Sequence, residues 1–218
     1  MRKVFQQNLA EVQQGLVDIA QRVVDAIQNA VSALGDSDVS LADQVISGDL
    51  IIDDLSAQID DLTLEILLLQ APVANDLRFI VDTMRMSGSL ERMGDLAAHI
   101  AQLARMRFPE SAGVQAVREQ LLEMGEHAAR QAVRVEALLR TENPDYIAEI
   151  IDSDDAVDAL HKQVLTTLTR PHEDIEMTSS QIVDATLANR YLERFSDHAV
   201  SIARRIRHRV EDHREERA

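Results

Sequence analysis

The chain has 218 residues and a formal net charge of −16, and it contains no cysteine and no tryptophan. This negative charge disfavours binding to nucleic acid or to an anionic membrane surface, because both repel acidic proteins. Without cysteine, disulfides and thiolate metal sites are excluded, so any metal site must use oxygen or imidazole ligands. Only 3% of the residues are aromatic, so the core must be built from aliphatic side chains, which favours packing of helices on helices.

Membrane insertion is not expected from the sequence. The longest strictly apolar stretches, such as Ile66 to Leu69, are far too short to span a bilayer, and the N-terminus has no signal-peptide core. We therefore expect a cytoplasmic protein.

Six segments have the periodicity of helices, and turns at glycine and proline separate them. In the first segment, apolar residues recur at alternating steps of four and three, which is typical of a helix in a bundle. Asn143 and Pro144 read as a helix N-cap followed by proline at the first helical position. We expect helices at residues 2–34, 39–70, 75–106, 112–141, 144–169 and 177–213.

The sequence also repeats itself. The segment Leu90–Asp95 matches Leu192–Asp197, and the segment Asp49–Leu55 aligns with Asp154–Leu160. Short connections make the helices of each half antiparallel neighbours. The repeat predicts an all-α fold of two tandem antiparallel three-helix bundles related by internal duplication, the first at residues 1–108 and the second at residues 112–218.

Each half carries two pairs of acidic residues spaced four apart. Residues at this spacing lie on one face of a helix, about 5–6 Å apart, where two like charges repel unless a cation compensates them. A single pair is more simply read as a solvated acidic face, but the same arrangement recurs in both halves. The pairs are Asp49 and Asp53, Glu91 and Asp95, Asp154 and Asp158, and Glu193 and Asp197.

The spacing of these pairs from the turns places them at equal heights. Asp53 and Glu91 both lie nineteen residues from Pro72, and Asp49 and Asp95 both lie twenty-three residues from it. Helices rise by about 1.5 Å per residue, so in an antiparallel hairpin the two pairs stand level.

The second half has the same mirror symmetry. Asp158 is level with Glu193, and Asp154 is level with Asp197. If the helix faces also point together, four carboxylates converge in each bundle and require a cation, and an oxygen-rich site favours Mg²⁺, Mn²⁺, Ca²⁺ or iron. His99 and His161 extend these acidic stripes, although an interfacial or solvated histidine is the simpler interpretation.

Three segments resemble one known family. Leu90–Asp95, Leu192–Asp197 and the run Pro72–Arg78 are similar to motifs of the PhoU family, whose members are accessory proteins of the high-affinity phosphate transport system. The resemblance covers nearly the whole chain. The second half departs from the family pattern, because Phe195 and Ser196 replace a small aliphatic residue followed by glycine.

The resemblance implies two tandem three-helix bundles that bind metal at the acidic motifs. By this resemblance the metal ligands are Glu91, Asp95, Glu193 and Asp197, and the facing motif of the same sites is Asp49, Asp53, Asp154 and Asp158. Iron, magnesium or manganese on oxygen ligands is implied, and zinc is less favoured. It also implies a homodimeric negative regulator of phosphate homeostasis that is not an enzyme. Family members couple the ATPase subunit of a phosphate ABC transporter to a sensor histidine kinase, which they hold inactive when phosphate is plentiful. Such a protein is cytoplasmic and reaches the inner face of the membrane through its partners.

Two other interpretations are compatible with the residues alone. One is a carboxylate-bridged di-metal enzyme, but such sites usually need paired Glu-x-x-His motifs, and this chain has none. The other is a metal-free helical adaptor whose acidic residues are only solvated. Direct sensing of phosphate is disfavoured by the negative charge, unless a bound metal supplies positive potential.

Overall fold

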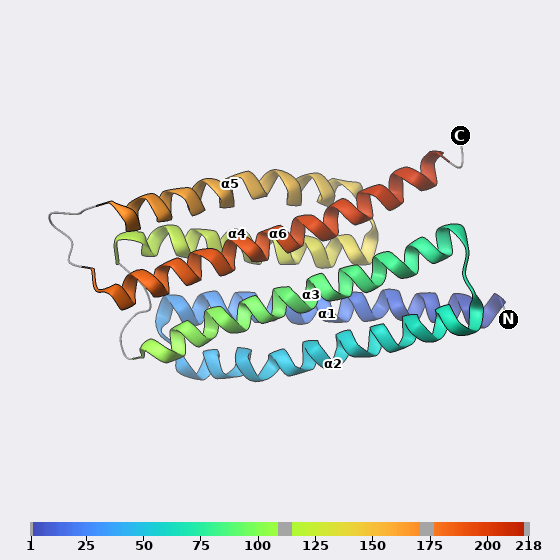
Figure 1. Cartoon of the computed structure of the whole chain (residues 1–218), viewed down its shortest axis with the longest axis horizontal. Helices are drawn as coiled ribbons and strands as arrows, with labels where there is room; N and C mark the ends of the chain where they lie inside the picture. Colours follow the sequence, from blue (N-terminus) through green and yellow to red (C-terminus); the bar gives the residue numbers. More distant parts are fainter. Residues whose placement is uncertain (1, 109–114, 171–176, 216–218) are drawn as a thin grey trace.

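The computed structural model describes residues 2–108, 115–170 and 177–215, and these residues form an all-helical fold (Figure 1). This confirms the expected class of two tandem three-helix bundles. The described part of the chain contains no helix that is long and apolar enough to cross a membrane. In chain order the elements are α1 (Arg2–Asp36), α2 (Val39–Gln70), α3 (Ala74–Arg107), the short 3-10 helix η1 (Gln115–Val117), α4 (Arg118–Thr141), α5 (Pro144–Thr169) and α6 (Ser179–Glu215).

Side-chain caps fix several of the helix ends. Asp38 accepts a hydrogen bond from the backbone N–H of Leu41 at 3.0 Å and so begins α2. The predicted cap of α5 is confirmed, because the Asn143 side chain accepts from the N–H of Asp145 at 3.0 Å. These caps explain why the expected boundaries of α2 and α5 agree with the structure.

The start of α4 differs from the expectation. We expected a helix from residue 112, but the α-helix begins at Arg118 after one 3-10 turn, and no side chain caps it. Residues 109–114, where the expected boundary between the halves falls, lie outside the described residues.

The three helices of each half pack on one another, and the two halves are joined where α1 packs on α4 and α3 packs on α6. Figure 1 shows α3 and α6 crossing side by side along the long axis of the molecule. A single hydrophobic core includes residues from all six helices. Arg107 and Asp184 also join α3 to α6, with hydrogen bonds of 2.5 and 3.0 Å. The two bundles therefore share a continuous hydrophobic core, and their division into separate domains stays a prediction.

The duplicated motifs bury equivalent side chains. Leu90 and Leu192 are fully buried at matching positions of α3 and α6, and Ile52 and Val157 are buried at matching positions of α2 and α5. Each motif thus turns the same apolar face into its own bundle, which leaves the neighbouring acidic residues at the edge between two helices.

Candidate metal centre

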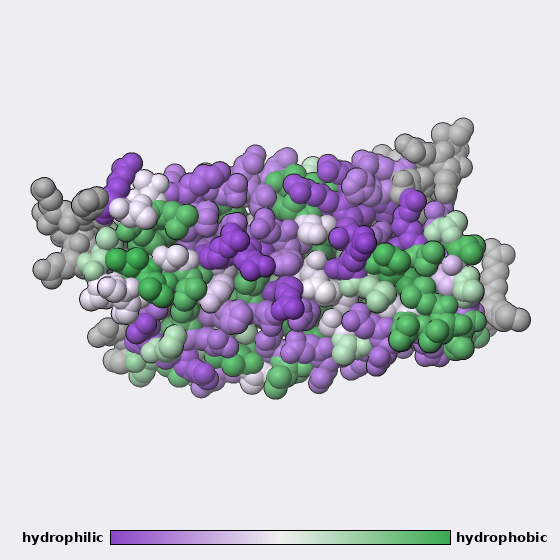
Figure 2. All heavy atoms as spheres, viewed as in Figure 1, coloured by the Kyte–Doolittle hydropathy of each residue, from purple (hydrophilic) through white to green (hydrophobic). Residues whose placement is uncertain are grey.

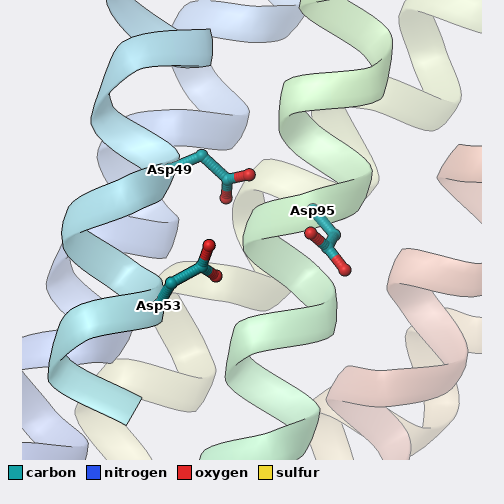
Figure 3. Close-up of side chains that lie close together, drawn as sticks. All are labelled: Asp49, Asp53 and Asp95. Carbon is teal, nitrogen blue, oxygen red and sulfur yellow. The ribbon is translucent and has the colours of Figure 1, made fainter. Parts of the chain in front are cut away.

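In the first bundle, three of the predicted ligands come together between α2 and α3. Asp49, Asp53 and Asp95 each offer a carboxylate oxygen, and these three oxygens lie within 4.8 Å of one another. Figure 3 shows Asp49 and Asp53 extending from α2 toward α3, which carries Asp95. The mirror symmetry about Pro72 predicted the height of this group, and the structure adds that its side chains face one another.

Glu91, the fourth predicted ligand, lies beside this group. The negative charge of Glu91 contributes to the raised pKa of Asp49. The pKa of Glu91 is itself raised, first by burial and then by the charges of Asp95 and Asp53. Arg92 holds Glu91 at 3.4 Å from its Nε and donates a 2.7 Å hydrogen bond from Nη1 to Asp95. One arginine thus partly balances the two acidic residues of α3.

The negative charge of Asp49 on α2 is poorly compensated by the groups around it. Burial, followed by the charges of Asp53, Asp95 and Glu91, raises the pKa of Asp49 to about 6. The Oδ1 atom of Asp49 is buried and has no hydrogen-bond partner among the described residues. A buried carboxylate oxygen without a donor, next to two further carboxylates, has the character of a site for a hard cation.

Gly94 allows α2 and α3 to approach closely at this site. A Cβ atom at Gly94 would lie 2.9 Å from Ile52 Cδ1 and 3.0 Å from Asp49 Oδ1. Any side chain here would therefore push on both the core and the carboxylate. Gly94 belongs to the repeated motif Leu90–Asp95, but its role is visible only in the packing of the two helices.

In the second bundle, three of the four equivalent acidic residues have donors of their own. Ser196 Oγ donates a 2.6 Å hydrogen bond to Asp154, and Lys162 Nζ lies 3.3 Å from Asp158 Oδ2. Arg190 Nη1 donates to both oxygens of Glu193, at 2.8 and 2.7 Å.

No three acidic or histidine side chains of the described second half come as close together as the group in the first bundle. The prediction of a metal site there, from Asp154, Asp158, Glu193 and Asp197, stays a prediction. Burial raises the pKa of Asp154, while its hydrogen bond from Ser196 acts in the opposite direction. Burial also raises the pKa of Glu193, and the neighbouring Asp197 adds to this effect.

The two histidines near the motifs differ in their surroundings. His99 stacks on the ring of Tyr191 with a centroid distance of 5.1 Å, as expected for an interfacial residue. His161 has a buried Nδ1 atom with no hydrogen-bond partner among the described residues. Sequence reasoning favoured the simple interpretation for both, and the structure supports it most clearly for His99.

Arginines near the end of α6 contact other helices. Arg205 lies 3.6 Å from Asp82 of α3, and Arg209 pairs with Glu142 at 2.5 Å while its guanidinium stands 5.2 Å above the ring of Phe79. Because these partners are far apart in sequence, the pairs could not be found from local patterns.

A family model described as the PhoU domain matches residues 16–104 and 121–206. The chain belongs to the PhoU family. The two matched segments fall on the two bundles, in agreement with the predicted duplication, and the family membership expected from the motifs is confirmed.

Curated PhoU proteins are similar to this chain. It is 39% identical over 162 residues to the phosphate-specific transport system accessory protein PhoU homolog 2 of Mycobacterium tuberculosis, covering 74% of this chain and 75% of that protein. It is 31% identical over 161 residues to PhoU homolog 1 of Methanothermobacter thermautotrophicus, covering 74% and 73% of the two chains.

Two solved structures share the fold. The crystal structure of PhoU from Pseudomonas aeruginosa superposes with a TM-score of 0.89 at 27% identity, covering 95% of this chain and 99% of that one. The phosphate transport system regulatory protein PhoU from Streptococcus pneumoniae superposes with a TM-score of 0.77 at 25% identity, covering 93% and 94%.

Proposed function

We propose that this chain is a non-enzymatic regulator of phosphate uptake that binds metal through its acidic motifs. The observation that carries this proposal is the convergence of Asp49, Asp53 and Asp95 in a chain made of two PhoU domains. Similar proteins bear the name of accessory protein of a phosphate-specific transport system. We infer that this chain couples the ATPase subunit of a phosphate ABC transporter to a sensor histidine kinase and holds the kinase inactive when phosphate is plentiful.

The first bundle is the better candidate for metal. Asp49, Asp53 and Asp95 would hold a divalent or trivalent ion such as iron, manganese or magnesium, and zinc is less favoured because this group contains no histidine. A bound ion would supply the positive charge that the buried oxygen of Asp49 lacks and would hold α2 against α3. This role is structural and electrostatic, and it needs no reaction at the site.

Metal content tests this part of the proposal. The chain should be purified without chelators and its metal measured by mass spectrometry, in the wild type and in the Asp49→Asn/Asp95→Asn variant. The wild type should carry at least one ion per chain, and the variant should lose the ion of the first bundle. Asp54→Asn, an exposed neighbour on the same helix, is the matched control and should keep it. Equal metal content in the wild type and the double variant would contradict the proposed site.

Partner binding is tested separately. The ATPase subunit of the phosphate transporter and the cytoplasmic part of the sensor kinase should each be retained by the immobilised chain. Deletion of its gene should switch on phosphate-starvation genes in medium rich in phosphate. If neither partner is retained and the deletion leaves this response unchanged, the regulatory role is wrong, whatever the metal content.

The same reasoning extends to assembly and location. We propose a homodimer in the cytoplasm that reaches the membrane only through its protein partners. Light scattering after gel filtration measures the mass of the assembly, and a monomeric mass at micromolar concentration would contradict the dimer.

A further inference from the structure

A cavity of about 240 Å³ lies between α3 and α6, where the two bundles meet. We name it the seam pocket. Its lining includes Arg92 and Asp95 from α3, and Arg190 and Arg194 from α6. In the view of Figure 2, the middle of the face over these two helices is strongly hydrophilic, with apolar patches toward both ends of the molecule.

The lining of the seam pocket is rich in positive charge although the chain as a whole carries −16. Three arginines face it with one aspartate. Arg194 forms no hydrogen bond or ion pair within the described part of the chain, and it is exposed to solvent at the pocket. Burial lowers the pKa of His198, which also lines the pocket, and the positive charges of Arg194 and Arg92 lower it further. Three guanidinium groups therefore stand around one small space, and that of Arg194 has no acceptor among the described residues.

The internal duplication indicates that this charge is concentrated at one place. Arg92 and Arg194 hold the same position in the two motifs, so packing of α3 on α6 brings the arginine of each half to one cavity. The neighbouring positions are not symmetric. Gly88, Ser89 and Leu96 in α3 correspond to Arg190, Tyr191 and His198 in α6, and all three residues of α6 line the pocket. Two of these changes, at Arg190 and His198, place a hydrogen-bond donor where α3 has none.

We propose that the seam pocket binds a small tetrahedral oxyanion, of the class of inorganic phosphate, through Arg92, Arg190 and Arg194. The planar guanidinium group donates paired hydrogen bonds to neighbouring oxygens of such an anion, which makes arginine well suited to phosphate. Pockets for larger organic ligands usually measure about 300–1,000 Å³, so the seam pocket suits a small ion with some water.

The existing ion pairs do not block this site. Arg92 pairs with Glu91 and Asp95, and Arg190 pairs with Glu193, but both arginine side chains are more than half exposed. Exposed ion pairs contribute little to stability, so these guanidinium groups can turn toward an anion. Nor does the overall charge exclude binding, because the field of distant carboxylates is screened over about 8 Å at physiological ionic strength.

This inference goes beyond the proposed function and does not depend on it. The oxyanion would bind whether or not the chain contacts a transporter or a kinase, and the measurement below uses neither partner.

Calorimetric titration of sodium phosphate into the full chain tests the seam pocket. Metal is first removed with EDTA, and ionic strength is held constant with sodium chloride. The wild type should show one saturable site per chain. Arg194→Gln should weaken binding by about tenfold or more, because it removes a charged donor without breaking an ion pair. Arg207→Gln is the matched control, since Arg207 is also exposed on α6 but does not line the pocket, and it should bind like the wild type.

Arg194→Lys separates charge from geometry. It keeps the positive charge but loses the paired donors, so its affinity should fall between those of the wild type and Arg194→Gln, and its circular dichroism should match the wild type. The proposal is wrong if the wild type binds phosphate more weakly than about 10 mM, or if Arg194→Gln and Arg207→Gln bind equally well.

Titration with O-phosphoserine identifies the source of the anion. Weaker binding than inorganic phosphate would support the free ion as the ligand. Tighter binding would support the same pocket chemistry with a phosphoryl group carried on a larger molecule.

Discussion

The two acidic clusters occupy equivalent places in the two bundles, yet they balance their charge differently. In the first cluster, Asp49 has a buried oxygen without a donor, and Asp53 has no hydrogen-bond or ion-pair partner among the described residues. In the second cluster, Asp154, Asp158 and Glu193 each have a partner of their own, from Ser196, Lys162 and Arg190. The first cluster therefore keeps two carboxylates without a partner in the described part of the chain, while three of the four carboxylates of the second cluster are paired.

Two paired differences explain this contrast. The first bundle has Gly94 and Ile52 where the second has Ser196 and the smaller Val157. The hydroxyl of Ser196 then reaches Asp154, whereas Gly94 offers nothing to Asp49. Duplication therefore keeps acidic residues in place, but the residue at the position of Gly94 or Ser196 decides whether the neighbouring aspartate has a hydrogen-bond donor from the protein.

The largest expected effect is a difference in metal affinity between the clusters. Asp49→Asn/Asp53→Asn should weaken Mn²⁺ binding on the order of 100-fold, because it removes two of three converging ligands. Asp154→Asn/Asp158→Asn should weaken the tighter binding step by less than about threefold. Calorimetric titration of both variants measures this, and a larger loss in the second variant would reverse the comparison.

Loss of the serine hydroxyl should destabilise the second bundle. Ser196→Ala leaves a buried oxygen of Asp154 without its donor, and we expect the free energy of unfolding to fall by about 1–2 kcal/mol. Urea denaturation in EDTA measures it. Ser47→Ala is the control, because the exposed Ser47 hydroxyl bonds only to the backbone of its own helix. Similar stability of the two variants would mean that Asp154 does not need this hydrogen bond.

Asp49 should make the metal-free protein less stable as pH rises. Its pKa of about 6 in the folded chain is above its ordinary value of 3.8, so the folded state binds the proton more tightly than the unfolded state. Stability is therefore lost as pH rises from 3.8 to about 6 and stays low above that. After allowance for partial exposure, we expect Asp49→Asn to be more stable than the wild type by about 1 kcal/mol at neutral pH, with no difference below pH 3.8.

Denaturation in EDTA at several pH values checks this dependence on pH. Asp54→Asn controls for the removal of one negative charge from the same helix. A constant difference between Asp49→Asn and the wild type across the whole range would contradict the assignment to Asp49.

The smallest expected effect concerns Lys162. Its pair with Asp158 is exposed on both sides, so Lys162→Gln should change the free energy of unfolding by less than about 0.5 kcal/mol. Thermal denaturation measures this change. A larger loss would show that the second cluster depends on Lys162, and that its balance of charge is weaker than the hydrogen bond from Ser196 suggests.

Much of the fold and part of the site could be predicted from local patterns. The expected helices agree with the structure to within a few residues at most ends, because caps such as Asn143 act within one turn of the chain. The equal spacing of Asp49 and Asp95 from Pro72 correctly predicted that they stand at the same height on neighbouring helices. The asymmetry of the two clusters was less visible, although Ser196 marked the departure, because its effect depends on the distance from its hydroxyl to Asp154.

The sequence by itself determined the helices, their duplication and the height of each acidic residue, because helical period and rise are properties of the local backbone. Only the tertiary structure decided which side chains meet across helices. The rotation of α2 against α3 depends on how Gly94 and Ile52 fit together. Arg92 and Arg194 line one cavity only because α3 packs against α6. These contacts join segments far apart in the chain, so their geometry follows from side-chain volume and packing, which no local pattern encodes.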